Sequence, residues 1–90
     1  MHLKIKLLPP YRRAGEKDTS SLELEVEELT VKELVDYLSR EWKEKLEYPL
    51  VDEQKGYLTA EFIVNGKHAK LEQKLNSGDE ITVVPYISGG

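Results

Sequence analysis

Alternation of apolar and polar residues along the chain predicts most of its strands. A β-strand turns successive side chains to opposite faces, so a period of two gives it one buried and one exposed side. Leu3, Ile5 and Leu7 show this period first, with Lys4 and Lys6 between them. On this basis we expect strands over residues 2–7, 22–27, 60–64 and 80–85.

A tight turn follows the third of these strands. Asn65-Gly66 supplies the two positive φ angles that a type I′ hairpin turn requires. We therefore expect residues 67–71 to return as a short antiparallel strand. The polar segment 11–21, by contrast, predicts a long loop between the first two strands.

The strongest helical signal follows the second strand. Thr30 and Glu33 are spaced as a capping box, in which the threonine hydroxyl accepts a hydrogen bond from a backbone N–H at the helix start. Apolar residues then recur in steps of three and four, which predicts one buried stripe along a helix. They are Val31, Leu34, Val35, Leu38, Trp42 and Leu46. We expect a helix from Val31 to about Leu46, with Trp42 at the edge of the core.

These elements come in the order strand, strand, helix, strand, short strand, strand. Two hairpins that flank one helix predict an α+β domain whose helix packs across a mixed sheet. If the first and last strands lie side by side, they run parallel, because a helical crossover joins them with the usual handedness. This is the β-grasp (ubiquitin-like) fold, with one main helix on a mixed sheet of four to five strands. We assign residues 1–85 to this domain and 86–90 to a flexible C-terminal tail that ends in Gly-Gly.

Length and charge narrow the function classes. The 90 residues predict one small domain with little room for a large catalytic cavity. Lys and Arg number 13 against 17 Asp and Glu, a net charge of −4, which argues against binding nucleic acid. The lack of cysteine excludes disulfides and cysteine nucleophiles. With no apolar run near the roughly 20 residues of a membrane helix and no signal peptide, we expect a cytoplasmic protein without membrane contact.

Conventional active-site patterns are missing from the sequence. It has no Gly-rich phosphate loop and no serine–histidine–aspartate arrangement. Its two histidines, His2 and His68, are far apart in the chain and fit exposed strand positions. The alternating glutamates of residues 23–27 fit a solvated strand face better than a metal site. We therefore predict that the chain binds no metal or cofactor and is not an enzyme on its own.

The C-terminal residues carry the most distinctive chemistry. Gly89-Gly90 has no side chains, so a partner enzyme can close a narrow channel around it. Fully extended, residues 86–90 reach about 17 Å. An α-carboxyl group has a pKa near ~3.5, so the carboxylate of Gly90 is inert at neutral pH until it is activated, for example as an anhydride with AMP. Sulfide would then give a thiocarboxylate, and a lysine amine would give an isopeptide.

A docking surface can also be predicted from the way successive side chains of a strand alternate between the two faces of the sheet. If Phe62 and Val83 face the helix, then Ile63 and Val84 face outward, although both are apolar. Together with Ile87 they could line a patch that leads to the tail. Single apolar residues on a protein surface are common, so the alternative is that Ile63 and Val84 have no role in binding.

Three stretches of sequence together resemble a known family. They are Phe62-Ile63-Val64-Asn65-Gly66-Lys67, Leu75 with Gly78-Asp79-Glu80, and Pro85-Tyr86-Ile87-Ser88-Gly89-Gly90. With the β-grasp order, they look like MoaD, the small subunit of molybdopterin synthase, in the MoaD/ThiS family of ubiquitin-like sulfur carriers. The layout covers the whole chain, and the specific motifs lie in its last third. Tyr86 departs from the family pattern, which usually has a proline there.

The resemblance implies a function that depends on partners. A MoeB-like enzyme would use ATP to adenylate Gly90, and a sulfurtransferase would supply the sulfur of a thiocarboxylate. The tail would then enter a MoaE-like large subunit, which holds the catalytic residues, and would donate dithiolene sulfur to a pterin precursor. Gly89 would be the steric companion of Gly90. The partner-binding candidates are Ile63, Val84, Tyr86, Ile87 and Ser88.

Two other functions fit the same residues. Activated Gly90 could be joined to lysine side chains, which would make the chain a ubiquitin-like protein modifier. Alternatively, the chain could be a β-grasp interaction module in which Gly89-Gly90 has no chemical role. Conjugation would produce species of higher mass in cell extracts. An interaction module, by contrast, would not be modified by any activating enzyme.

Overall fold

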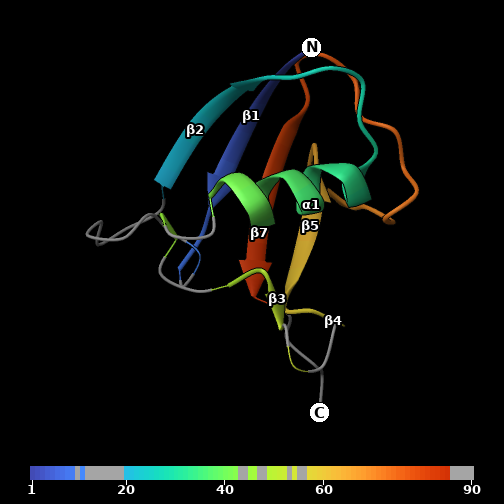
Figure 1. The fold of residues 1–90 in the computed structure, drawn as a ribbon. Helices are drawn as coiled ribbons and strands as arrows, with labels where there is room; N and C mark the ends of the chain where they lie inside the picture. The colour runs from blue at the N-terminus through green and yellow to red at the C-terminus, as the bar shows by residue number, and fades with distance from the viewer. Residues whose placement is uncertain are drawn as a thin grey trace.

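A computed structural model of the chain describes residues 1–9, 11, 20–42, 45–46, 49–52, 54 and 57–85. One helix lies across one face of a five-stranded sheet, and a second, two-stranded sheet is present (Figure 1). No helix in these ranges is long and apolar enough to cross a membrane. The predicted tail, residues 86–90, lies outside the described residues, so the division of the chain after residue 85 stays a prediction.

The five-stranded sheet has the strand order β2-β1-β7-β5-β6. Its strands are β1 (His2–Leu7), β2 (Ser20–Glu25), β5 (Ala60–Val64), β6 (Lys67–His68) and β7 (Glu80–Pro85). β1 and β7 pair in parallel, and the other neighbours are antiparallel. The crossover contains α1 (Val31–Glu41), which covers one face of the sheet (Figure 1). This arrangement confirms the β-grasp prediction, including the parallel contact between the first and last strands of the sheet.

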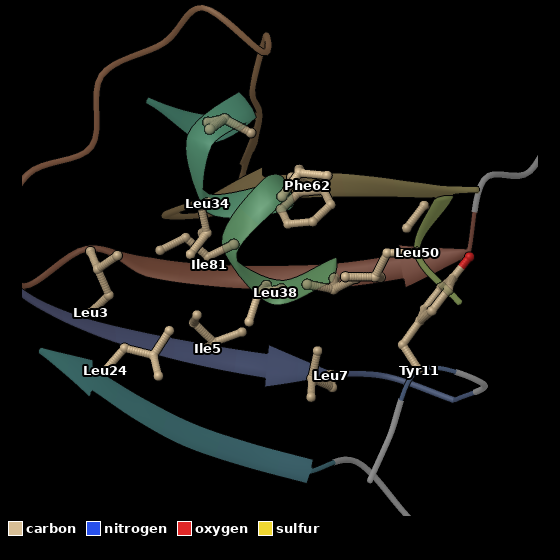
Figure 2. Close-up of a cluster of buried hydrophobic side chains, with 14 of the residues drawn as sticks. Leu3, Ile5, Leu7, Tyr11, Leu24, Leu34, Leu38, Leu50, Phe62 and Ile81 are labelled. Atoms are coloured by element: carbon tan, nitrogen blue, oxygen red, sulfur yellow. The ribbon is translucent and has the colours of Figure 1, made fainter. Parts of the chain in front are cut away.

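The hydrophobic core lies between this face of the sheet and the buried stripe of α1. Figure 2 shows side chains of the strands and of Leu34 and Leu38 gathered in the space between helix and sheet. The residues that the sheet contributes are Leu3, Ile5, Leu7, Leu22, Leu24, Ala60, Phe62, Val64, Ile81 and Val83. Burial of apolar surface stabilises a fold by roughly 25 cal/mol per Å². Because a slip of one residue in any strand would turn the buried side chains of that strand to solvent, their burial also fixes the register.

The start of α1 confirms the predicted capping box. Oγ1 of Thr30 accepts a hydrogen bond from the backbone N–H of Glu33 (3.2 Å), and a carboxylate oxygen of Glu33 accepts one from the N–H of Thr30 (3.0 Å). The N–H of Val31 donates to the carbonyl of Gln73 (2.9 Å), in the loop before β7. Because the first N–H groups of a helix have no partner within it, these bonds set where α1 begins and tie it to that loop.

The end of α1 corrects the sequence prediction. The helix ends at Glu41, whereas we expected it to continue to about Leu46. Trp42 is the C-cap, with φ −115° and ψ 9°, and its N–H still donates to the carbonyl of Leu38. Leu46 is buried all the same, because a turn in which its N–H donates to the carbonyl of Trp42 follows the helix. Trp42 packs against the edge of the core, as predicted.

β6 covers only the first two residues of the strand that we expected there. The Asn65-Gly66 turn forms as predicted, with φ of 51° and 84°. The strand β6 ends at His68, and the last bond to β5 is from the N–H of Ala69 to the carbonyl of Phe62 (3.1 Å). The chain then passes the start of α1, where the carbonyl of Leu71 accepts a hydrogen bond from the N–H of Lys32 (2.9 Å). Capping the helix therefore occupies backbone that a longer strand would have placed in the sheet.

Both ends of the predicted loop 11–21 belong to the folded domain. Tyr11 is 2% exposed, and its hydroxyl donates a hydrogen bond to the carbonyl of Thr59 (2.7 Å). At the other end β2 begins at Ser20, which is buried, and it ends at Glu25, two residues before the predicted end. Because the segment is mostly polar, the sequence analysis did not predict that either end is ordered.

The segment before β5 holds two strands that the sequence analysis did not predict. They are β3 (Val51–Asp52) and β4 (Tyr57–Leu58), which pair in antiparallel to form the two-stranded sheet. Strands of two residues are too short to show a period. The segment before them meets the core through Leu50, which is 2% exposed.

Candidate functional site

The surface on which the sequence analysis placed a docking site is the face of the sheet opposite α1, which we call the outer face. Its side chains are those that alternate with the buried ones along each strand. They belong to His2, Lys4, Lys6, Ser21, Glu23, Glu25, Glu61, Ile63, His68, Glu80, Thr82 and Val84. The members are mostly charged, and Ile63 and Val84 are its two aliphatic residues.

Ile63 and Val84 lie close together on the outer face. Ile63 pairs with Thr82 between β5 and β7, and Val84 is two positions further along β7 on the same face. Such diagonal neighbours have Cα atoms about 7–8 Å apart, so their side chains cover adjoining areas. Both residues are partly buried. We call Ile63, Thr82 and Val84 the outer-face patch. The structure confirms that the two aliphatic residues face outward, and their role in binding stays a prediction.

The outer-face patch lies at the end of the strand that leads to the tail. Val84 is followed by Pro85, the last residue of β7. The remaining site residues that the sequence predicted all lie outside the described residues; they are Tyr86, Ile87, Ser88, Gly89 and Gly90. Within the described part of the chain, the predicted site therefore consists of Ile63 and Val84.

Charged pairs lie beside the outer-face patch. Nζ of Lys6 is 3.4 Å from a carboxylate oxygen of Glu80, and Lys6 is the neighbour of Thr82 in the sheet. On the other side, Nδ1 of His68 is 3.6 Å from a carboxylate oxygen of Glu61, a polar contact that is an ion pair only with a protonated imidazole. Exposed ion pairs of this kind contribute at most about 1 kcal/mol each. They nevertheless place polar and charged side chains on two sides of Ile63 and Val84, and an apolar centre with a polar rim is typical of protein–protein interfaces.

A second group of charges lies where β1 begins. Nδ1 of His2 is 2.6 Å from a carboxylate oxygen of Glu25, and Nε2 is 3.5 Å from one of Glu23. The hydrogen bond with Glu25 raises the pKa of His2 above 6.5, desolvation acts in the opposite direction, and the charge of Glu23 adds to the rise. The ammonium of Met1 donates to the carbonyl of Val26 (2.7 Å), and its nitrogen is 3.9 Å from Glu25.

We predict that Glu25→Gln lowers the pKa of His2 toward 6.5, as measured by NMR titration of the imidazole ring. Because the pKa of His2 is higher in the folded chain than in the unfolded one, its ion pairs stabilise the fold fully below pH 6.5. That contribution is lost as the pH rises through the raised pKa. Over this range the native chain should therefore lose more stability than the Glu25→Gln chain. An identical titration of His2 in both proteins would contradict the assignment.

A hydrogen-bond network fixes the start of β7, and the sequence analysis did not predict it. The buried carboxylate of Asp79 accepts hydrogen bonds from Nδ2 of Asn65 (2.9 Å) and from the N–H of Asn76 (2.8 Å). Oδ1 of Asn65 in turn accepts one from the N–H of Glu80 (2.9 Å). The network joins the turn after β5 to the strand that leads to the tail. Gly78, the residue before Asp79, has φ 91°, a conformation that suits glycine. The Gly78-Asp79 pair is therefore the sequence feature from which this turn could have been predicted.

The described residues hold no other arrangement with clear chemistry. Among them, no group of three His, Asp or Glu side chains is placed to hold a metal ion. A hollow of about 800 Å³ lies against α1, with Glu33, Asp36 and Arg40 in its lining. Because α1 covers the other face of the sheet, this hollow is separate from the outer-face patch.

Comparison with known sequences matches nearly the whole chain. The model of the ThiS family matches residues 5–90. A protein of Archaeoglobus fulgidus assigned as a sulfur carrier protein is 34% identical over 73 residues. The aligned region is 77% of this chain and 83% of that protein.

Two solved structures share the fold. SAMP1 from Haloferax volcanii superposes with a TM-score of 0.66 at 22% identity and covers 100% of both chains. A protein of Pyrococcus furiosus assigned as subunit 1 of a molybdopterin converting factor has a TM-score of 0.63 at 23% identity, over 96% of this chain and 98% of that one. Because the family match extends over almost the entire sequence, the chain belongs to the ThiS family of ubiquitin-like sulfur carriers.

Proposed function

We propose that the chain carries sulfur as a thiocarboxylate on Gly90 and acts as the small subunit of a molybdopterin synthase. The observation that carries this proposal is the family match over residues 5–90, because the matched region includes Gly89-Gly90. The likeness to the Pyrococcus furiosus protein assigned as a molybdopterin converting factor subunit supports this synthase among the possible uses of a sulfur carrier.

The proposed chemistry uses the terminal carboxyl group and no side chain. First, a carboxylate oxygen of Gly90 bonds to the α-phosphorus of ATP and pyrophosphate leaves, which forms an acyl adenylate. Sulfide from a sulfurtransferase then attacks the acyl carbon and AMP leaves, which forms the thiocarboxylate. The thiocarboxylate sulfur then bonds to the pterin precursor. Water attacks the acyl carbon, the C–S bond breaks, the sulfur stays on the precursor and Gly90 returns to a carboxylate. A MoeB-like enzyme would catalyse the activation and a MoaE-like subunit the transfer, so this chain supplies no catalytic side chain.

The outer-face patch is the proposed docking surface for these partners. It consists of two aliphatic side chains and one threonine, it is partly exposed and bordered by polar and charged side chains, and two of its residues lie on the strand that leads into residues 86–90. A partner that covers Ile63 and Val84 therefore meets the start of the tail at the edge of the same contact. Tyr86, Ile87 and Ser88 would extend this contact, and Gly89 would pass through the narrowest part of the partner's channel.

We predict that Ile63→Asp weakens binding to the MoeB-like enzyme about tenfold, or about 1.4 kcal/mol. The new carboxylate would lose its water at the interface without gaining a partner. In the free chain residue 63 is partly exposed, so the fold should persist. Leu71→Asp is the matched control, because Leu71 is 40% exposed and lies outside the outer face. Calorimetric titration measures both affinities, and equal values for the two variants would remove the outer-face patch from the interface.

Intact mass distinguishes the proposed function from its alternatives. The chain is incubated with ATP, an activating enzyme and a source of sulfur. Replacement of one oxygen by one sulfur in the product supports the sulfur carrier. Conjugates of higher mass in cell extract would instead support a protein modifier, in which a lysine amine attacks the activated Gly90. A mass that no activating enzyme changes would leave only an interaction module and overturn the proposal.

A further inference from the structure

β2 is a long strand at one edge of the sheet. The two edges are β2 and β6, and β2 has six residues whereas β6 has two. Figure 1 shows β2 at the side of the sheet with no described strand beyond it. A long edge strand offers its outward N–H and C=O groups to an additional strand, whereas a very short one does not. β2 is therefore the edge of the described sheet at which another strand can add.

The hydrogen bonds of β1 show which residues of β2 face this edge. The N–H of Lys4 donates to the carbonyl of Asp79 (3.1 Å), so the even-numbered residues of β1 direct their backbone groups toward β7. The odd-numbered ones bond to β2, where the register pairs Leu3 with Leu24. Because the direction alternates along a strand, the backbone groups of Glu23 and Glu25 point away from β1. Each residue presents one N–H donor and one C=O acceptor to the edge.

The side chains along this edge alternate between acidic and apolar. The side chains of Glu23 and Glu25 lie on the outer face and are 62% and 74% exposed. Leu24, between them, turns to the other face and is 8% exposed. Glu27 and Glu28 follow β2 and are exposed as well. Among the described residues, these four carboxylates outnumber the three cationic groups beside them, so the edge is negatively charged. The cationic groups are the His2 ring, the Met1 ammonium and the side chain of Lys4, which pairs with Glu23 in the sheet.

We propose that β2 docks an extended basic segment of a partner protein, which adds to the sheet as a further strand. In this segment Lys or Arg alternates with an apolar residue. Two basic side chains then lie opposite Glu23 and Glu25 on the outer face, and the apolar side chain between them lies beside Leu24. A second copy of this chain is a poor occupant, because pairing β2 with β2 would place glutamates against glutamates.

This edge is separate from the outer-face patch. β1 lies between β2 and β7, the strand that leads to the tail. A basic strand on β2 therefore leaves Ile63 and Val84 accessible. The proposal goes beyond the sulfur-carrier function and does not depend on it, because binding to β2 needs neither Gly90 nor ATP.

The test titrates the isotope-labelled full chain with the peptide acetyl-Lys-Val-Lys-Val-Lys-amide and follows amide hydrogen exchange by NMR. We expect exchange at Glu23 and Glu25 to slow about tenfold. A peptide of the same composition in the order Lys-Lys-Val-Val-Lys should give no such protection. Equal protection by both peptides, or protection that spares Glu23 and Glu25, would overturn the proposal. Protection that rises with protein concentration alone would identify a second copy as the occupant and overturn it too.

Two substitutions separate strand addition from general attraction between charges. Glu23→Pro removes an outward N–H but no bond to β1, and proline is tolerated at such edge positions. Glu23→Lys reverses one charge of the edge. Each should weaken peptide binding about tenfold. Glu72→Lys changes the net charge as much as Glu23→Lys does but in an exposed loop, and it should leave the affinity unchanged. Equal weakening by the two lysine variants would contradict the proposal.

Discussion

Gly89→Val is expected to reduce thiocarboxylate formation on Gly90 about 100-fold, because a displacement of about 1 Å at a reacting carbon costs that much in rate. A branched side chain next to Gly90 would widen the tail where the activating enzyme must close around bare backbone. Gly89→Ala adds a single methyl group and should cause a smaller loss. Mass spectrometry of the intact chain over the course of the reaction measures both rates.

Two further variants test whether this loss comes from the tail itself. One alanine added after Gly90 keeps both glycines but moves the carboxyl group onto a residue with a side chain, so thiolation should fall strongly. Glu72→Val places the same branched side chain in an exposed loop and should leave the rate unchanged. A native rate for the Gly89→Val protein would show that the channel does not need bare backbone, and would remove the steric role from Gly89.

Leu38→Ala is expected to lower the free energy of unfolding by about 3 kcal/mol, within the range found for buried leucines. Leu38 is 1% exposed and lies in the core between α1 and the sheet (Figure 2). Removing its side chain leaves a cavity that close-packed neighbours cannot fill. The loss is a large part of the roughly 5–15 kcal/mol that stabilises a typical domain. Urea denaturation followed by circular dichroism measures it.

Lys32→Ala is the matched control on the same helix. Lys32 is exposed, and its bond to the loop before β7 uses the backbone N–H, which alanine retains. The change in unfolding free energy should stay within about 0.5 kcal/mol. Similar values for Leu38→Ala and Lys32→Ala would mean that Leu38 does not pack in the core.

The parts of the fold that could be predicted from sequence have strong local signals. Burial of one strand face requires a period of two, and this placed β1, β5 and β7 close to their observed bounds. The capping box placed the first residue of α1 at Val31, and Asn65-Gly66 placed the hairpin turn. The same period of two also predicted that Ile63 and Val84 face outward, because residues that alternate with the buried ones lie on the opposite face of the strand.

Most of the features that were predicted wrongly or missed depend on contacts between distant segments. The apolar spacing continues to Leu46, but a turn after Glu41 serves to bury that residue as well as a helix would. The strand after Gly66 is short because the chain leaves the sheet to cap α1. At the site, the pair of His2 with Glu25 and that of Asn65 with Asp79 join residues 23 and 14 positions apart. A local pattern in the sequence contains no information on such pairs.

Tandem mass spectrometry of the C-terminal peptide, from protein isolated from its own cells, tests the central claim most directly. If Gly90 is the sulfur-carrying residue, the peptide ends at Gly90, and part of it has one oxygen of the terminal carboxyl group replaced by sulfur. A chain that continues beyond Gly90 in the mature protein, or sulfur that is found only on other residues, would contradict the account.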